Sequence, residues 1–149
     1  MENKYSFRGY DKEKMVAVKG SSLPISTKTS REIARFIKGK KVSKMKAYLA
    51  KVVEAKLPIP FTKFNRDTPH RKGRGFGPGR FPKKASQVIG KLLHGIEKQA
   101  ENKGLDLEKL KLIHVAAQKG PNIMHWGRQR GKRKITHVEL IAAEEDNKK

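Results

Sequence analysis

The chain has 149 residues, a length typical of one domain, with 36 Lys and Arg against 14 Asp and Glu and a formal net charge of +22. So large an excess repels itself in a compact state, so we expect a polyanionic partner; nucleic acid fits best, because each phosphate contacted releases condensed counterions. The lack of cysteine excludes disulfides and thiolate chemistry, and the lack of a long apolar run or of a signal-peptide core predicts no membrane partner.

The first part of the chain is predicted to form a strand and a helix. After a polar and aromatic lead-in over residues 1–14, the apolar run 15–18 predicts a short strand. A helix is predicted over residues 26–39, with Ser26 as its N-cap and an apolar face of Ile33, Phe36 and Ile37. An alternative start is a capping box one turn later, formed by Thr29 and Glu32.

A second helix and a basic loop are predicted next. The helix runs from Ser43, a candidate cap, to the Leu57-Pro58 pair, and its apolar stripe has helical spacing at Met45, Tyr48, Leu49, Val52 and Val53. Periodicity then disappears over residues 61–83, which are rich in glycine. Residues 56–84 contain nine Lys or Arg and one acid, Asp67, so this segment adds little to a core.

The last third of the chain is predicted to form a helix and two strands. The helix runs from about Lys84 to a C′ glycine at Gly104, and one face carries Ala85, Val88, Ile89, Leu92, Leu93, Ile96 and Ala100. The strands are expected over residues 110–117, where Ile113, Val115 and Ala117 share a face, and over residues 135–143. Between them, residues 118–134 carry six basic residues and no acid.

This order predicts a single α+β domain over residues 1–149, with a small three-stranded antiparallel sheet packed with three helices. The Gly-rich basic loop spans residues 61–83. The last two strands form an extended hairpin over about residues 110–143, whose tip, about residues 122–133, protrudes as a basic β-hairpin.

The protruding hairpin is the first candidate nucleic-acid contact. A two-stranded ribbon is marginal in water, so one covered in cations makes sense if RNA supplies the missing packing partner. Trp126 lies among His125, Arg128 and Arg130, and aromatic and guanidinium planes can stack on unpaired bases while the cations contact phosphates. The alternative is a flexible, solvated charged loop.

The Gly-rich segment 70–80 is the second candidate. Glycine lets the backbone approach a phosphate closely, and the interleaved Arg and Phe side chains can stack on bases. It is not a P-loop, because no G-K-[ST] ending is present. The alternative is a disordered linker.

Catalytic and metal sites are poorly supported by the sequence. His114 and His137 could face each other on paired strands near Glu139, but a metal site needs more ligands at a defined geometry. Asp67 is expected to pair with a neighbouring Arg, and the acids at 144–146 to form a solvated tail cluster. We therefore expect no enzyme, no cofactor and no metal.

Several short motifs, in order and in register from about Tyr5 to Glu144, resemble the archaeal and eukaryotic type of the large-subunit ribosomal protein family numbered twenty-two, called seventeen in some eukaryotic schemes. They include Tyr5-Ser6, the helix ending Ile37-Lys38-Gly39, Tyr48-Leu49 with Val52, Pro60-Phe61, Asn65, His70-Arg71, residues 79–85, Leu105-Asp106 with Leu110, His114-Val115, residues 119–121 and residues 137–141. Arg128, Gly131 and Lys132 resemble the family's Arg-x-x-Gly-Arg element, with Lys in place of the last Arg, and residues 121–136 are fewer than is usual in the family.

The resemblance implies a structural constituent of the large ribosomal subunit, in the cytoplasm, that binds large-subunit ribosomal RNA and organises it during assembly. It implies neighbouring ribosomal proteins as partners, no homo-oligomer, and a hairpin that lines the nascent-peptide exit tunnel and touches the nascent peptide transiently. The tunnel-lining tip would comprise Met124, His125, Trp126, Gly127, Arg128, Gln129 and Arg130.

The expected RNA-binding residues are cations of the body, the loop and the hairpin, together with one histidine and the tryptophan. They are Lys28, Arg31, Lys38, Lys40, Lys41, Arg66, His70, Arg71, Lys72, Arg74, Arg80, Lys83, Lys84, Lys119, Trp126, Arg128, Arg130, Lys132, Arg133 and Lys134. We expect the loop and hairpin to be poorly ordered until RNA is bound. A DNA-binding architectural protein, a nucleic-acid enzyme and a free RNA chaperone remain as alternatives.

Overall fold

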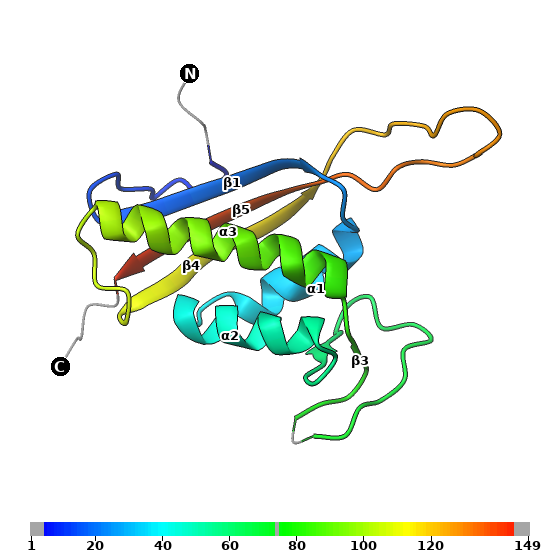
Figure 1. The fold of residues 1–149 in the computed structure, drawn as a ribbon, viewed down its shortest axis with the longest axis horizontal. Coiled ribbons are helices and arrows are strands. Elements are labelled where there is room, and N and C mark those ends of the chain that lie inside the picture. Colours follow the sequence, from blue (N-terminus) through cyan, green and yellow to red (C-terminus); the bar gives the residue numbers. More distant parts are fainter. Residues whose placement is uncertain (1–4, 74, 145–149) are drawn as a thin grey trace.

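Three antiparallel strands form the sheet around which the chain folds. The computed structural model describes residues 5–73 and 75–144, and in it β1 (Met15–Leu23), β4 (Leu110–Lys119) and β5 (Thr136–Glu144) lie in the order β1-β5-β4 (Figure 1). The last strand is therefore central, flanked on one side by the first strand and on the other by its own hairpin partner. The predicted α+β class with three helices and a three-stranded antiparallel sheet is confirmed.

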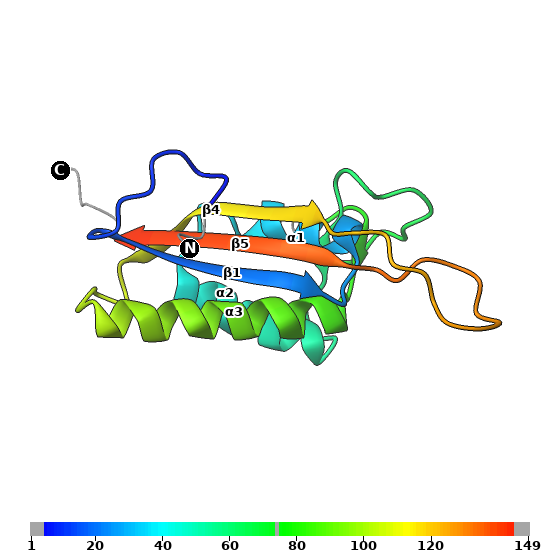
Figure 2. The same cartoon turned by 90° about the horizontal axis from the view of Figure 1, so that it is seen from above.

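Helices α1 (Thr27–Ile37) and α3 (Lys83–Asn102) pack on one face of this sheet, and α2 (Val42–Val53) packs against α3 (Figures 1 and 2). The predicted apolar stripes form the core between these layers. Side chains that are fully buried there include Ile33, Ile37, Leu49, Ile89, Leu93, Ile96, Leu112 and Leu140. Burial of such aliphatic side chains stabilises the fold by about 1.5–3 kcal/mol each.

The predicted helix ends lie within a few residues of those observed; the largest difference is at α2, which ends at Val53, before the predicted stop at Leu57-Pro58. Ser26 occupies the N-cap of α1, although its side chain makes no capping hydrogen bond, and Gly39 follows the helix with a φ of 79° that favours glycine. The capping box of Thr29 and Glu32 does not form, because the Glu32 carboxylate accepts hydrogen bonds from the backbone amides of residues 62–64 instead. Ser43 is not the cap of α2: the helix begins at Val42 after Lys41, whose extended backbone bridges to Lys111 at β4.

The predicted face of β4 was wrong in its first half. A bulge lies between Leu112 and His114, so that Leu112 pairs with Ala142 and His114 with Ile141. The extra residue reverses the alternation: Leu112 and Val115 both point into the core, whereas Ile113 is exposed. A strict period of two cannot anticipate such an inserted residue.

The second face of the sheet is covered by the chain's own N-terminal segment. The Tyr5 hydroxyl donates to the carbonyl of Ala17 (3.3 Å), and the backbone amide and hydroxyl of Ser6 both donate to the buried carboxylate of Glu139 (3.0 and 2.6 Å). Lys19 lies 3.0 Å from the same carboxylate. The expected lead-in is thus packed on the sheet over its described residues; residues 1–4 lie outside them.

Candidate nucleic-acid interface

Two long connections project from the same end of the fold. Figures 1 and 2 show the loop between α2 and α3 and the hairpin between β4 and β5 leaving the end of the fold where α1 begins; in Figure 1 the hairpin continues along the direction of the sheet, whereas the loop turns away on the side of α2. These are the Gly-rich loop and the basic hairpin expected from the sequence. That the two segments leave the same end is a tertiary feature, because about 60 residues separate their starts along the chain.

The start of the loop is held by a buried carboxylate on α1. Glu32 is only 2 % exposed, and its two oxygens accept hydrogen bonds from the backbone amides of Thr62 (3.1 Å), Lys63 (2.8 Å) and Phe64 (2.8 Å) and from the Thr62 hydroxyl (3.2 Å). Burial by itself raises the pKa of the Glu32 carboxyl, but these hydrogen bonds together lower it below its ordinary value. The charged carboxylate therefore fixes the backbone of residues 62–64 to the helix.

The remainder of the loop is closed by a short two-stranded sheet that no pattern in the sequence predicts. Strand β2 (Ile59–Pro60) pairs with β3 (Gly79–Arg80). Inside this neck, the Phe61 amide donates to the Pro78 carbonyl (2.9 Å), and the Arg71 amide donates to the Gly77 carbonyl (3.0 Å). Two-residue strands are too short to leave a period, so only the tertiary contacts reveal them.

Two of the predicted RNA-contacting arginines also brace the loop. Arg71 donates through Nε to the Gly79 carbonyl (3.2 Å), and Arg80 donates through Nε to the Thr68 hydroxyl (3.1 Å). Their guanidinium groups lie 5.1 Å from the Phe81 ring centroid and 5.9 Å from that of Phe61. Because a guanidinium has five N–H donors, each retains donors for a phosphate while one is used internally.

The hairpin is supported far less. Beyond the strands, the Gly120 amide donates to the Ile135 carbonyl (2.9 Å), and further out the Arg133 and His125 amides donate to Ile123 and Gly131 (2.7 and 3.1 Å). A Cβ at Gly120 would lie 2.5 Å from the Ile135 side chain, so glycine permits the close approach at the base. Residues 121–130 are all exposed, and Trp126 is 86 % exposed.

Between the two projections lies a basic groove of about 560 Å³. It is formed by the first turn of α1, by Phe64 of the loop and by the two arms at the base of the hairpin. Its lining includes six cations and no acid among the described residues: Lys28, Arg31, Lys119, Lys132, Arg133 and Lys134. A smaller groove of about 380 Å³ adjoins it through Ser26 and Lys134 and adds Lys83 and Lys84 from the start of α3.

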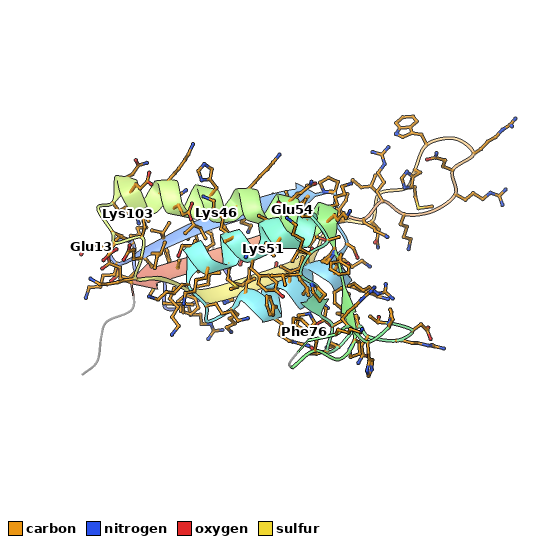
Figure 3. The ribbon with its side chains drawn as sticks, turned by 60° about the horizontal axis from the view of Figure 1, so that its bottom comes forward. Glu13, Lys46, Lys51, Glu54, Phe76 and Lys103 are labelled. Atoms are coloured by element: carbon orange, nitrogen blue, oxygen red, sulfur yellow. The ribbon has the colours of Figure 1, made fainter. Side chains whose placement is uncertain are left out.

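The charge distribution at this end favours an anion. Neither α1 nor α3 has an acid in its first turn, where Lys28, Lys83 and Lys84 stand instead. Acids are favourable at a helix N-terminus and cations are not, because the helix dipole is positive there. Figure 3 shows that Glu13 and Lys103 lie at the end of the molecule opposite to the basic groove. Phe76 lies in the loop between α2 and α3.

The other predicted RNA-binding residues fall into three groups. Lys38, Arg66, His70 and Lys72 are exposed, as are Arg128 and Arg130 of the hairpin tip. Lys40 and Lys41 are half-buried; the Lys40 ammonium lies 3.4 Å from the Phe36 ring centroid, and burial lowers its pKa. Arg74 lies outside the described residues.

Two residues that matter at this end were not anticipated. The sequence predicts Glu32 only as part of a capping box, and it predicts no role for Phe64. Glu32 did leave a signal, since it is the only acid between Glu13 and Glu54 in a basic stretch. The role of Phe64 depends on contacts distant in the sequence. Asp67 pairs with its neighbour Arg66 at 3.6 Å, as expected.

The suggested pair of facing histidines is wrong. His114 lies opposite Ile141 and His137 opposite Gln118, so the register sets the two histidines four residues apart along the paired strands. His114 Nε2 lies 3.1 Å from the Ser6 hydroxyl, and burial and the nearby Lys38 lower its pKa. The described residues contain no group of three or more His, Cys, Asp or Glu side chains that could hold a metal ion. Among the described helices, none combines the length and apolar character needed to cross a membrane.

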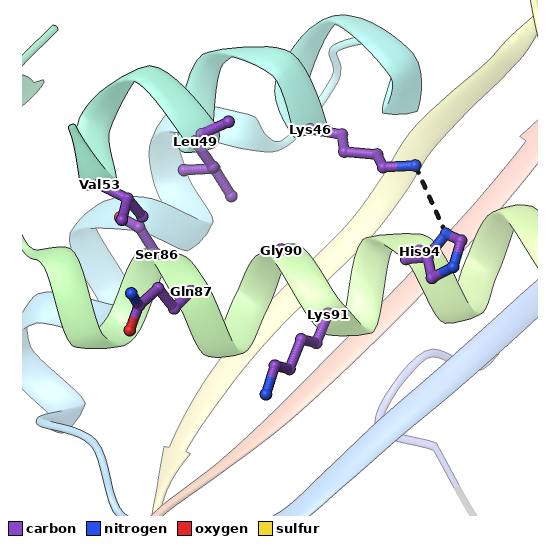
Figure 4. Close-up of a pocket in the computed structure, with 9 residues that line it drawn as sticks. Lys46, Leu49, Val53, Ser86, Gln87, Gly90, Lys91 and His94 are labelled. Carbon is purple, nitrogen blue, oxygen red and sulfur yellow. Dashed lines mark hydrogen bonds between the residues drawn. The ribbon is translucent and has the colours of Figure 1, made fainter. Parts of the chain in front are cut away.

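A separate, apolar groove of about 330 Å³ lies between α2 and α3 (Figure 4). Leu49, Ala50, Val53 and Gly90 line it, and Lys46 at its edge donates to Glu97 (2.5 Å). The Ser86 hydroxyl is buried there without a hydrogen-bond partner in the described part of the chain. The apolar groove has no lining residue in common with the basic groove.

Comparison with known proteins identifies the family of this chain. A sequence profile described as ribosomal protein L22p/L17e matches residues 18–141. The large ribosomal subunit protein uL22 of Methanoculleus marisnigri is 41 % identical over 139 residues, which cover 89 % of this chain and 91 % of the relative. The protein of the same name from Cenarchaeum symbiosum is 39 % identical over 146 residues (94 % and 96 %), and that from Nanoarchaeum equitans is 41 % identical over 140 residues (89 % and 80 %). The chain therefore belongs to the ribosomal protein L22p/L17e family, a family of structural proteins of the large ribosomal subunit.

Proposed function

We propose that this chain binds and organises large-subunit ribosomal RNA through the end of the fold from which its loop and hairpin project. As a member of its family it is a structural constituent of the large ribosomal subunit and works in the cytoplasm as part of the ribosome; the family is not known for enzymes. The proposal adds the surface by which it holds RNA.

The observation that carries the proposal is the basic end itself. Six cations surround one groove without an acid among its described lining residues, and the first turns of two helices add cations where the helix dipole already disfavours them. The free protein gains no stability from this arrangement of cations. Phosphates placed in the groove would meet cations and the N-terminus of α1 together, which is favourable for anions.

The hairpin tip has a second proposed role, as a lining of the nascent-peptide exit tunnel. Its apolar side chains support this role: Ile123, Met124 and Trp126 are 46 %, 56 % and 86 % exposed, although large apolar side chains are usually buried. Neighbouring ribosomal proteins and the nascent peptide are the proposed protein partners, and no homo-oligomer is proposed.

A binding titration and a sedimentation experiment test the RNA-binding proposal. The full chain is titrated with large-subunit ribosomal RNA and with duplex DNA of equal total charge at several salt concentrations. We expect tighter binding to ribosomal RNA and retention of the chain on large subunits after a high-salt wash. Equal affinity for DNA would favour an architectural DNA-binding protein, and loss from washed subunits would favour a free RNA chaperone.

The tunnel proposal is tested by a photo-crosslinking residue at position 126 in translating ribosomes. A crosslink from this position to the nascent peptide is expected. Crosslinks to ribosomal RNA alone would contradict the tunnel role.

A further inference from the structure

The basic groove is built differently from a surface that only attracts a polyanion. Three segments distant in the sequence form its walls, and its volume of about 560 Å³ lies within the range of small-molecule sites, roughly 300–1,000 Å³. That volume suits a single nucleotide. A continuous duplex, whose bases are stacked inside, has no separate base to place there.

One part of the groove suits a phosphate. Ser26 leaves the first turn of α1 without a side-chain cap, so backbone N–H groups of that turn remain as donors. Lys28 is exposed beside them, and Arg31 lies one turn further on. Arg31 uses its Nε to donate to the Ala117 carbonyl (3.2 Å), which holds its guanidinium in place and leaves other N–H groups for a ligand.

Another part of the groove suits a base. Phe64 is half-buried and is the one aromatic side chain among the described lining residues. Its backbone amide is held by the Glu32 carboxylate at 2.8 Å, so the residue that carries the ring is fixed to α1 although it lies in a loop. The Lys28 ammonium lies 5.9 Å from the ring centroid, so the phosphate and base parts are adjacent.

We infer that this groove holds one unpaired nucleotide of the bound RNA, with its phosphate at the start of α1 and its base stacked on Phe64. The inference rests on the proposed RNA-binding function and gives it a specific site. Asn122, at the hairpin base, also lines the groove, and its amide can both donate to and accept from the edge of a base. The loop and the hairpin then close on the nucleotide from two sides.

The test compares two RNA hairpins that differ only by one unpaired adenosine in the stem. Base–aromatic stacking contributes about 1–3 kcal/mol, so we expect the full chain to bind the bulged hairpin about tenfold more tightly. Phe64→Leu should abolish this preference, so that the variant binds the two hairpins with equal affinity. The salt dependence of binding should stay unchanged, because no charge is removed.

Three further variants make the test specific. Phe76→Leu changes an aromatic residue of the same loop that does not line the groove, and it should keep the preference. Phe64→Trp retains a stacking surface and should keep it as well. Lys28→Met should weaken binding of both RNAs and reduce the salt slope, because it removes a phosphate contact.

Equal affinity of the unmodified chain for the two hairpins would overturn the inference, as would an equal loss of affinity for both in Phe64→Leu. The unmodified chain alone supplies the first comparison, so a folding defect in one variant does not remove the test. If the preference is absent while the chain stays on washed large subunits, only the nucleotide site is wrong. If the chain binds neither RNA and leaves the subunits, the proposed function itself is wrong.

Discussion

The loop and the hairpin have similar compositions and leave the same end of the fold, but they differ in how they are supported. The loop is tied to α1 through Glu32, closed by β2 and β3, and braced by Arg71 and Arg80. The hairpin beyond Gly120 has a few cross-strand backbone bonds and an exposed surface along residues 121–130. Basic composition predicts a contact with RNA, but it does not predict whether the contacting segment is preorganised. Here a buried carboxylate, a short sheet and two arginines make that difference.

The sharpest test of this contrast is Glu32→Ala. It removes a charged acceptor from four hydrogen bonds and leaves three backbone amides without it, so we expect the free energy of unfolding to fall by about 3 kcal/mol. Urea denaturation of the full chain measures it. The matched control is Glu54→Ala, because Glu54 is exposed and pairs with the exposed Lys56, so stability should hardly change. A small effect at Glu32 would mean that the loop is not anchored there.

Replacement of hairpin residues 122–133 by a short turn should weaken RNA binding and leave the free energy of unfolding unchanged. The fold should keep its stability, because these residues contribute nothing to the core. The affinity for large-subunit ribosomal RNA should fall by about 100-fold near physiological salt, because four Lys and Arg are lost. Fluorescence titration and urea denaturation measure the two quantities.

The control removes the same charge elsewhere, by changing Lys44, Lys51, Lys91 and Lys98 on α2 and α3 to Gln. These lysines are exposed and lie outside the basic groove. An equal loss of affinity in this variant would show that total charge matters and the hairpin does not.

Amide hydrogen exchange of the free protein should separate the two projections directly. The amides of Thr62, Lys63 and Phe64, which donate to Glu32, should exchange at least about tenfold more slowly than those of residues 124–132. The predicted lack of order before RNA binding would then apply to the hairpin tip and the outer loop, and not to the loop's first residues. Strong protection of residues 124–132 would contradict it.

The smallest expected effect concerns pH. The pKa of Glu32 is lowered in the folded state, so its contribution to stability is fully present above its ordinary value of 4.5 and is lost as the pH falls through the lower, folded value. Glu139, also buried and with a lowered pKa, adds to the same acid sensitivity. Glu32→Gln should reduce stability by about 1 kcal/mol at neutral pH and flatten its decline below pH 4.5. An unchanged acid profile would assign the decline to Glu139 and other carboxyl groups.

Elements with a long, regular apolar period were predicted well, and short or irregular ones were not. The α3 face from Ala85 to Ala100 is buried as its spacing indicates, because a 20-residue helix repeats its signal over several turns. The bulge at Ile113 and the two-residue strands β2 and β3 have no comparable repeat. The site was likewise foreseen as a set of cations, whereas its anchor Glu32 and its aromatic wall Phe64 were missed.

By itself, then, the sequence determined the fold class, the core-facing residues of the helices, the family and the two cationic segments, because charge and periodicity are properties of local composition. Only the tertiary structure decided that these segments meet at one groove, that Glu32 holds one of them, and that Phe64 stands beside Lys28. Those relations join residues about 30 to 100 positions apart, and their proximity follows from the packing of α1 against the sheet rather than from any pattern along the chain.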